Sequence, residues 1–372
     1  MLELVLKKEE LLKGISITQS IAEKRTSMPI LSNVLLDIDG EKLCITATDL
    51  EISFKGTYEA EIVNSGRLTI PARKFYEIVN VMADETISLK ELENYSLSVS
   101  GLRSNYQLHG LQADDFPLMP DYEEITFINI EADILKEMIE MTVFSTSVEE
   151  TRYNLGGVYV TPVEDQNGKM LRFVSTDGHR LSLKDNLIAG LENLEFEKGV
   201  IISRKGLTEM RKFTEEGGEV RLGFTSNSAV LMKDEAVLVM RLLDGRFPDY
   251  QMVIPKNNDH VMQIKRKDFL DMLRRVAVMS SDRYKGTKFS LQSKNLTLTA
   301  INPELGEAKE DMPVDYEGVE LNLGFNVQYF IETMSAMKSE VVSLAFKDND
   351  SPCLVKGEDD TGFLGVLMPM KI

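Results

Sequence analysis

The stretch Asn33–Asp49 reads NVLLDIDGEKLCITATD, two apolar runs on either side of the pair Asp39-Gly40. Apolar runs that flank an Asp-Gly pair are typical of a β-hairpin, because glycine adopts the positive φ that a tight turn requires. The same pattern returns in Gly157–Asp177, where LRFVSTD stands in place of LCITATD, and again in Thr287–Ala300. One hairpin therefore occurs three times, which predicts a chain built from three like-folded units.

A second repeated element follows each hairpin, a strand that runs directly into a short helix. Its three copies are predicted at residues 66–82, 200–213 and 321–337, and corresponding elements lie roughly 125–130 residues apart. Each unit thus has two halves, and each half is a strand, a helix and further strands. This pattern predicts an α+β fold with antiparallel sheets. The helices of the first halves are predicted at Lys8–Ala22, Ala132–Phe144 and Arg266–Met279. The domain limits are predicted at 1–125, 126–254 and 255–372.

A sheet layer and a helix layer repeated in this way form an extended array, whose ends need a cap or a partner. The sequence shows no capping element at either end. Closure by head-to-tail dimerisation and an open array are both consistent with the residues alone.

The charge of the chain is distributed unevenly. The net charge of −18 argues against a nucleic-acid partner, because affinity for phosphates comes largely from Lys and Arg. Two predicted helical segments, 265–288 and 204–212, are nevertheless basic, whereas Glu131–Glu140 is acidic. For any one helix, a solvated face with internal ion pairs explains the basic residues. Their recurrence favours a moderately positive helical surface that touches phosphates without sequence preference.

The chain has no features of a secreted or membrane protein. No apolar run approaches the ~18–20 residues that a membrane span needs, and the N-terminal residues lack the order of a signal peptide. Cys44 and Cys353 lie far apart in strand-like runs, so we expect buried thiols rather than a disulfide or a metal site. We therefore expect a cytoplasmic protein without membrane contact.

Motifs for catalysis or cofactor binding are missing. The sequence contains no phosphate-binding loop, dinucleotide fingerprint, nucleophile elbow or zinc-protease helix, so we expect no cofactor, no metal and no enzymatic activity. The best candidate for an active site is Thr176–Leu181, TDGHRL, in which His179 would be a general base oriented by Asp177. A structural turn and a ligand-facing loop are the other interpretations. We favour the loop, because a turn-forming glycine separates the two side chains.

The chain resembles the bacterial DNA polymerase III beta subunit family, the sliding clamps, over its whole length. Five motifs in the right order carry this resemblance. They are MPILSN at Met28–Asn33, TATDLE at Thr46–Glu51, TDGHRL at Thr176–Leu181, DGRFPDY at Asp244–Tyr250 and LMPMKI at Leu367–Ile372.

The resemblance implies three tandem clamp domains per chain and a head-to-tail homodimer that forms a six-domain ring. Helices would line the hole, and antiparallel sheets would form the outside. Such a ring encircles double-stranded DNA and confers processivity on the replicative DNA polymerase. The implied partners are duplex DNA, the polymerase, a clamp loader, other proteins with a clamp-binding motif and a second copy of the chain.

The resemblance also implies a peptide-binding groove between the second and third domains. The family often has a basic residue at the position of Met252, so this chain departs from the pattern there. The matching positions are Leu155, Thr176, Gly178, His179, Arg180, Leu181, Pro248, Met252, Val253, Pro352, Val366, Leu367, Met368, Pro369 and Met370.

Residue-by-residue matching gives two further sets. The candidates for DNA contact are Arg25, Arg152, Tyr153, Arg204, Lys205 and Arg283. The candidates for the subunit contact are Lys74, Tyr106 and Leu108 on one chain, and Val278 and Met279 on the other. Lys74 would pair with Glu304 or Glu307 across this contact.

Two other classes of protein remain as alternatives. A hydrolase built on His179 would act without a partner protein, and a peptide-binding adaptor would need neither a ring nor DNA. The threefold repeat with basic helices favours the clamp.

Overall fold

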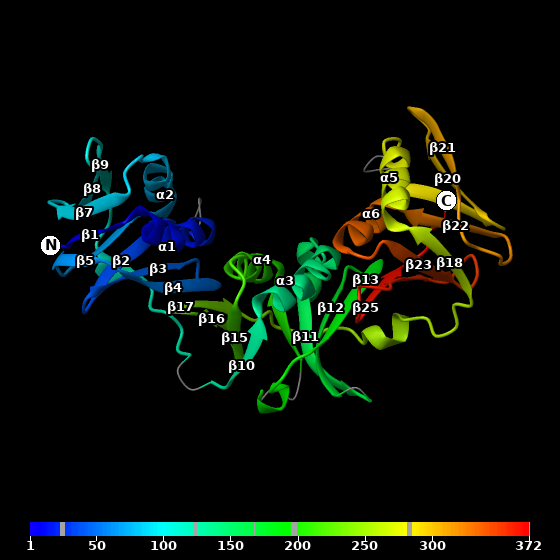
Figure 1. The fold of residues 1–372 in the computed structure, drawn as a ribbon, viewed down its shortest axis with the longest axis horizontal. Coiled ribbons are helices and arrows are strands. Elements are labelled where there is room, and N and C mark those ends of the chain that lie inside the picture. The colour runs from blue at the N-terminus through cyan, green and yellow to red at the C-terminus, as the bar shows by residue number, and fades with distance from the viewer. Residues whose placement is uncertain (23–26, 123–124, 167, 195–198, 281–284, 372) are drawn as a thin grey trace. The chain divides into compact units, whose positions relative to one another are not determined.

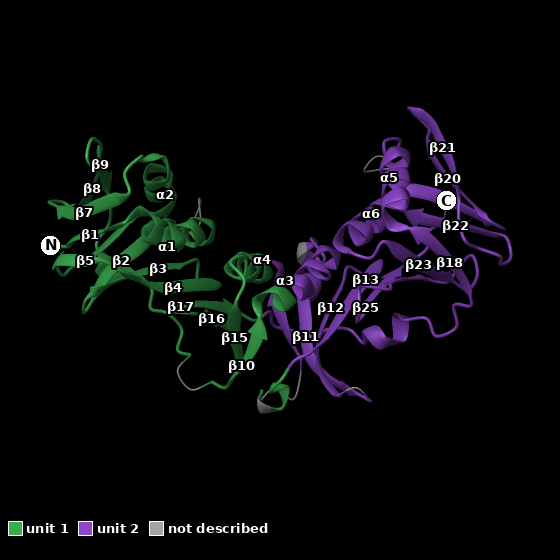
Figure 2. Ribbon diagram, in the orientation of Figure 1, with its two compact units in different colours: residues 1–136, 189–197, 205–242 green, residues 137–188, 198–204, 243–372 purple. Residues whose placement is uncertain are grey.

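The structure is a computed structural model of the chain. It describes residues 1–22, 27–122, 125–166, 168–194, 199–280 and 285–371. These residues form two compact units, which Figure 2 distinguishes by colour. Unit 1 comprises residues 1–136, 189–197 and 205–242, and unit 2 comprises residues 137–188, 198–204 and 243–372.

One strand, one helix and three strands recur along the described chain (Figure 1). The series is β1-α1-β2-β3-β4, β6-α2-β7-β8-β9, β10-α3-β11-β12-β13, β14-α4-β15-β16-β17, β18-α5-β19-β20-β21 and β22-α6-β23-β24-β25, with β5 as an addition. The α-helices are α1 (Lys8–Ile21), α2 (Ala72–Val81), α3 (Ala132–Glu140), α4 (Arg204–Phe213), α5 (Arg266–Ala277) and α6 (Val327–Ala336). The prediction of repeated halves in an α+β fold is therefore confirmed.

Unit 1 contains two antiparallel sheets. The five-stranded sheet has the order β5-β1-β7-β8-β9, and the eight-stranded sheet has the order β10-β15-β16-β17-β4-β3-β2-β6. The first consists of β1 (Glu3–Lys7), β5 (Glu61–Asn64), β7 (Thr86–Leu92), β8 (Ser96–Ser100) and β9 (Asn105–His109). The second consists of β2 (Asn33–Asp39), β3 (Lys42–Thr48), β4 (Ile52–Glu59), β6 (Arg67–Pro71), β10 (Phe127–Glu131), β15 (Glu219–Phe224), β16 (Ser228–Lys233) and β17 (Ala236–Arg241).

Unit 2 has a matching pair of antiparallel sheets. Their orders are β14-β11-β12-β13-β25-β24-β23-β18 and β21-β20-β19-β22. The eight-stranded sheet consists of β11 (Gly157–Asp165), β12 (Gly168–Thr176), β13 (Arg180–Leu187), β14 (Val200–Ser203), β18 (His260–Lys265), β23 (Val341–Phe346), β24 (Cys353–Gly357) and β25 (Phe363–Leu367). The four-stranded sheet consists of β19 (Gly286–Gln292), β20 (Asn295–Asn302), β21 (Gly306–Pro313) and β22 (Leu321–Asn326).

The helices form because their apolar residues recur at helical spacing. In α5, Phe269, Leu273 and Val276 are almost fully buried, whereas Arg274 and Arg275 between them are exposed. Helices α5 and α6 pack against each other in unit 2, and helices α1 and α2 pack against each other in unit 1 (Figure 1). The cores of both units thus lie between helices and sheets.

Helix α3 is shorter than the sequence predicted. It ends at Glu140, and the chain continues in the 3₁₀ turn Val143–Ser145 rather than in α-helix to Phe144. The hydroxyl of Thr142 donates to the carbonyl of Met138 at 2.7 Å, a bond by which threonine closes the last turn of a helix. The other short 3₁₀ segments are Pro29–Ser32, Ala113–Asp115, Glu150–Leu155, Leu191–Asn193 and Tyr250–Val253.

The Asp-Gly turn and the buried thiols that the sequence predicted are also confirmed. Gly40 has a φ of 63° in the β2–β3 hairpin. Cys44 and Cys353 are free and buried, and this burial raises the pKa of both thiols. Among the described helices, none is long and apolar enough to cross a membrane.

Candidate functional site

Strands β13 and β25 join two motifs that lie far apart in the sequence. Leu181 pairs with Val366, and the backbone N–H of Met368 donates to the carbonyl oxygen of His179 at 2.9 Å. The TDGHRL turn is thereby bonded to the residues that follow the last strand. The structure brings these two parts of the predicted groove together within unit 2.

An apolar cluster covers one face of the eight-stranded sheet of unit 2. It contains Leu181 and Val366, with Leu155 packed against them. Phe247 and Tyr250 complete the cluster, and the Phe247 ring stacks on Tyr159 with 5.0 Å between the ring centroids. These aromatic residues were not predicted as site residues, although the motif DGRFPDY contained two of them.

The segment after Phe247 carries the exposed part of the predicted groove. Pro248 is exposed, Met252 has 82% of its surface accessible, and Val253 is also exposed. Met370 is exposed near the end of the chain, and Pro352, Met368 and Pro369 are half-buried. Such a mixture of accessible apolar and thioether groups beside a packed cluster suits an apolar peptide ligand.

The Thr176–Arg180 turn is held by its own side chains. One carboxylate oxygen of Asp177 accepts the backbone N–H groups of His179 and Arg180 at 2.9 and 3.0 Å. Gly178 has a φ of 90°, a region that favours glycine. Among the described contacts, none joins Asp177 to the exposed imidazole of His179. This geometry gives no support to a catalytic Asp–His pair.

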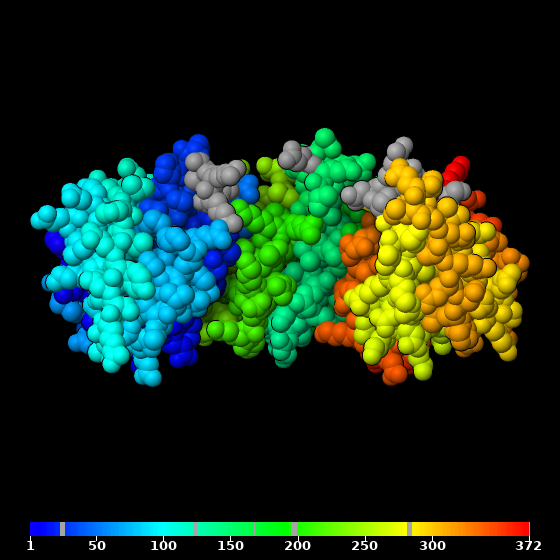
Figure 3. Space-filling view, turned by 90° about the horizontal axis from the view of Figure 1, so that it is seen from above, coloured from blue at the N-terminus to red at the C-terminus, as the bar shows by residue number. Residues whose placement is uncertain are grey.

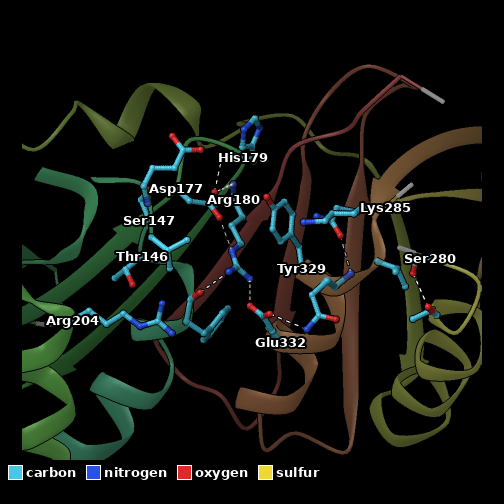
Figure 4. A pocket seen from close by; sticks show the side chains of 17 residues that line it. Thr146, Ser147, Asp177, His179, Arg180, Arg204, Ser280, Lys285, Tyr329 and Glu332 are labelled. Atoms are coloured by element: carbon cyan, nitrogen blue, oxygen red, sulfur yellow. Dashed lines mark hydrogen bonds and ion pairs between the residues drawn. The ribbon is translucent and has the colours of Figure 1, made fainter. Parts of the chain in front are cut away.

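Arg180 lies on the opposite face of β13 from Leu181, because side chains alternate along a strand. Its guanidinium, with the residue only 8% exposed, bonds the second oxygen of Asp177 at 3.0 Å and Glu332 at 2.5 Å. Figure 4 shows this arrangement, in which the guanidinium carbon of Arg180 lies over the ring of Tyr329, 4.5 Å from the ring centroid. Leu367 also faces away from the apolar cluster, into the core with Cys353. The structure therefore turns the Arg180 and Leu367 side chains away from the apolar groove candidates Leu181 and Val366.

A polar cavity of about 950 Å³ lies on the helix side of unit 2. Arg180, Tyr329 and Glu332 line it, together with Arg204 and Lys285 (Figure 4). The apolar candidates Leu155, Leu181 and Val366 do not line it. The cavity and the apolar cluster are therefore separate features on the two faces of one sheet.

An ion pair that the sequence did not reveal supports the apolar cluster. Arg172 binds both carboxylate oxygens of Asp185, at 2.7 and 2.6 Å, and donates to the hydroxyl of Tyr250 at 3.4 Å. These hydrogen bonds, above all those to Asp185, raise the pKa of Arg172, so its guanidinium remains charged. The bond to Tyr250 ties the segment that carries Met252 and Val253 to strand β12.

Three family models cover nearly the whole chain. The N-terminal, central and C-terminal domains of the DNA polymerase III beta subunit match residues 2–120, 129–249 and 251–371. The chain belongs to the DNA polymerase III beta subunit family, the beta sliding clamps. It accordingly has three tandem clamp domains.

Known members of the family match the chain from end to end. The beta sliding clamp of Pseudomonas putida is 34% identical over 371 residues, which is 99% of both chains. The crystal structure of the Caulobacter crescentus DNA polymerase sliding clamp is 34% identical, with a TM-score of 0.92 over 100% of both chains. A sliding clamp from Bartonella birtlesii, solved bound to griselimycin, is 31% identical, with a TM-score of 0.94 over 100% of both chains.

The clamp-family candidates for DNA contact have varied surroundings. Arg152 is exposed, donates to the carbonyl of Asp177 at 3.1 Å and lies 3.4 Å from Glu149, while its neighbour Tyr153 is 57% exposed. Arg204 lines the cavity of unit 2, and Lys205 forms an ion pair with buried Asp49 in unit 1. Two candidates, Arg25 and Arg283, lie outside the described residues.

The candidates for the subunit contact are partly surface residues and partly core residues. Tyr106 is 37% exposed on the edge strand β9, whereas Leu108 is buried in the core of unit 1. Val278 is 75% exposed, and Met279 packs partly against the core of unit 2. Lys74 is exposed and paired with Glu77 on its own helix. Figure 3 shows the residues around α5, in yellow, next to those of β20 and β21, in orange, and α5 contacts both strands.

The described part of the chain contains no group of three or more His, Cys, Asp or Glu side chains arranged to hold a metal ion.

Proposed function

We propose that two copies of this chain close head to tail into a ring that encircles duplex DNA and tethers the replicative polymerase to it. The observation that carries this proposal is the repeated strand–helix–three-strand unit, which ends in open sheet edges. Strand β9 is the last strand of one sheet in unit 1, and β21 is the last strand of one sheet in unit 2. Each leaves a row of backbone groups for another chain to pair with.

The proposed subunit contact joins the β9 edge of one copy to the β21 side of the other. Tyr106 offers exposed aromatic surface on β9, and Val278 offers exposed apolar surface directly after α5, a helix that contacts β21. A closed head-to-tail dimer would satisfy both edges at once. Lys74 would meet Glu304 or Glu307 of the partner across the same contact.

In this proposal the ring holds DNA by topology, with few phosphate contacts. The candidates are Arg25, Arg152, Tyr153, Arg204, Lys205 and Arg283. The pairing of Arg152 with Glu149 and of Lys205 with Asp49 supports weak contact, because these side chains already have partners. Weak, sequence-independent contact lets a ring slide. In this proposal the chain catalyses no reaction and acts in the cytoplasm. Its three domains would span residues 1–125, 126–254 and 255–372.

The proposed groove lies on the apolar cluster of unit 2. A partner peptide with a glutamine and a short apolar run would place its apolar side chains against the accessible Leu155, Pro248, Val253 and Met368. Leu181 and Val366 are buried and would form the layer beneath them. The ligand-bound clamp from Bartonella birtlesii supports a ligand site in this family. The polymerase, the clamp loader and other proteins with a clamp-binding motif would compete for this groove.

Retention on circular DNA tests the ring. After a clamp loader places the protein on nicked circular DNA, we expect it to remain bound in salt that removes ordinary DNA-binding proteins. Linearising the circle should release it, because a ring slides off a free end. A double variant, Val278→Asp with Met279→Asp, provides an open-ring control. Equal retention of the wild-type protein on circular and linear DNA would contradict the proposal.

A further inference from the structure

A network of charged side chains in unit 2 links helix α6 to the Thr176–Arg180 turn. It runs from Glu332 through Arg180 and Asp177 to the backbone of His179. We propose that Arg180 is a positioning residue for the peptide groove: its side chain acts from behind the sheet and fixes the turn that holds Met368 in the groove wall. This inference rests on the proposed peptide-binding function.

The guanidinium of Arg180 joins three separate parts of unit 2. It bonds Asp177 in its own turn, Glu332 on α6 and the carbonyl oxygen of Phe144, the last at 2.5 Å. A planar guanidinium presents its donors in a fixed fork, so these three bonds define both its position and its orientation. Arg180 therefore locks the turn to α6 and to the 3₁₀ segment Val143–Ser145.

The carboxylate of Asp177 passes this orientation on to the backbone. One of its oxygens bonds the Arg180 side chain, and the other accepts the N–H groups of His179 and Arg180. Since the two oxygens are fixed relative to each other, the ion pair also sets the direction of the turn. The carbonyl oxygen of His179 in turn accepts the N–H of Met368. A shift of the turn would therefore shift Met368.

The polar cavity explains why bonds rather than packing would hold this turn. The cavity of about 950 Å³ borders Asp177, Arg180 and Glu332 on the helix side. Close packing, which normally fixes a side chain inside a protein, is interrupted on the cavity side of these residues, although the rings of Phe144 and Tyr329 flank the guanidinium of Arg180. Hydrogen bonds between charged and partly buried groups then carry most of the constraint.

Glu332 provides the cleanest test, because it lies on α6 and not among the groove candidates. In Glu332→Gln the side chain keeps its size but loses the charge that binds Arg180. We expect a synthetic peptide with a glutamine followed by leucines and a phenylalanine to bind about tenfold more weakly, a change that corresponds to about 1.4 kcal/mol. Calorimetry on the full-length protein measures this affinity.

Glu137→Gln is the matched control. Glu137, on α3, forms ion pairs with Lys184 at 2.6 Å and Lys338 at 2.7 Å, which make up a second charged network. Lys184 lies on β13, on the same face as Arg180. Glu137 does not touch the Thr176–Arg180 turn. We expect this variant to change peptide affinity by less than about twofold, as for a site without shared partners. Equal losses in both variants would mean general loosening of unit 2 and would overturn the inference.

Hydrogen exchange of the Met368 amide gives a readout that does not depend on a ligand. We expect this amide to exchange faster in Glu332→Gln than in the wild-type protein and in Glu137→Gln. If the wild-type protein bound no peptide, the proposed groove would fail, while this exchange rate would still decide whether Arg180 positions Met368. An unchanged rate in Glu332→Gln, or peptide affinity equal to wild type, would overturn the inference.

Discussion

The turns Thr48–Ile52 in unit 1 and Thr176–Arg180 in unit 2 share one design. In both, the threonine hydroxyl accepts the N–H two residues on, at 3.0 Å to Leu50 and 3.1 Å to Gly178. In both, an aspartate oxygen accepts the next two N–H groups. Each turn also presents a carbonyl to another strand or its extension, Glu51 to Arg241 and His179 to Met368. The repeated sequence has thus built the same junction twice.

The difference lies in what surrounds the two turns. Asp49 is paired with Lys205, whose side chain is 40% exposed, whereas Asp177 is paired with Arg180, which is buried and also bound to Glu332. In unit 2 the following residues lead onto the apolar cluster and the last strand of the chain. The two turns thus share one backbone scaffold and differ in the side chains that surround it.

Removal of the central cations should show the largest contrast between the two units. Arg180→Met leaves Asp177, Glu332 and a carbonyl without their partner, so we expect a loss of about 3–5 kcal/mol in the free energy of unfolding. Lys205→Met leaves the buried carboxylate of Asp49 without its ammonium, but water can reach that position, so we expect a loss of about 1–3 kcal/mol. Urea unfolding of the full-length variants measures both. Equal losses in unfolding free energy would show that the additional partners of Arg180 do not make its ion pair more important than that of Lys205.

The second charged network of unit 2 predicts a dependence on pH. Burial disfavours the charged form of Glu137, but hydrogen bonds from Lys184 and Lys338 outweigh it and lower its pKa. A lowered carboxylate pKa stabilises the fold above the ordinary value of about 4.3, and this stability is lost as the pH falls through the folded-state pKa. Glu137→Gln should therefore cost about 1–3 kcal/mol at pH 7 and progressively less as the pH falls below about 4.3 and through the lowered folded-state pKa. A constant difference across this range would show that Glu137 does not act through its charge.

Tyr250 provides a further contrast between the units, because it belongs to the aromatic segment of the proposed groove in unit 2. Tyr250→Phe keeps the ring in the apolar cluster but removes the hydroxyl that Arg172 binds. We expect a loss of about 1 kcal/mol in unfolding free energy and severalfold weaker peptide binding. Tyr316→Phe, in the core of the same unit and with a hydroxyl bonded to Val319, is the matched control. The control should lose similar stability without the change in peptide affinity.

The smallest effect concerns the residue at positive φ. Leu50 has a φ of 75°, and Gly178, at the corresponding position of the turn in unit 2, has a φ of 90°. Leu50→Gly relieves strain of about 1–2 kcal/mol and costs about 0.5–1 kcal/mol in backbone entropy. A net gain of about 0.5–1 kcal/mol in unfolding free energy is expected from thermal or urea unfolding. A loss of stability would indicate that the Leu50 side chain contributes contacts that outweigh its backbone strain.

The sequence predicted much of the fold because its signals are local. The hairpin at Asn33–Asp49 and its copies followed from alternation and turn residues, and the six helices followed from apolar spacing. The α3 boundary was wrong by four residues because the bond from Thr142 to Met138 closes the helix early. The pairing of β4 with β17 joins segments from different repeats, and nothing in the local pattern specifies it.

The site was predicted less completely, because the sequence does not specify which residues of neighbouring strands lie opposite each other. The motifs at Thr176–Leu181 and Leu367–Ile372 came from the family resemblance, and their pairing through Leu181 and Val366 required the structure. Alternation along β13 alone would have placed Arg180 and Leu181 on opposite faces. The Arg172–Asp185 pair forms across a hairpin whose register the sequence leaves open.

Hydrogen exchange with and without peptide tests most directly whether the ligand binds beside the Thr176–Arg180 turn of unit 2 and not beside the corresponding turn, Thr48–Ile52, of unit 1. The full-length protein would be labelled alone and with a saturating synthetic peptide that has a glutamine followed by leucines and a phenylalanine. We predict slower exchange in residues 176–183, 247–253 and 364–370, and no change in residues 48–54 and 237–242. Protection centred on residues 48–54, or no protection in unit 2 under saturating peptide, would contradict this account.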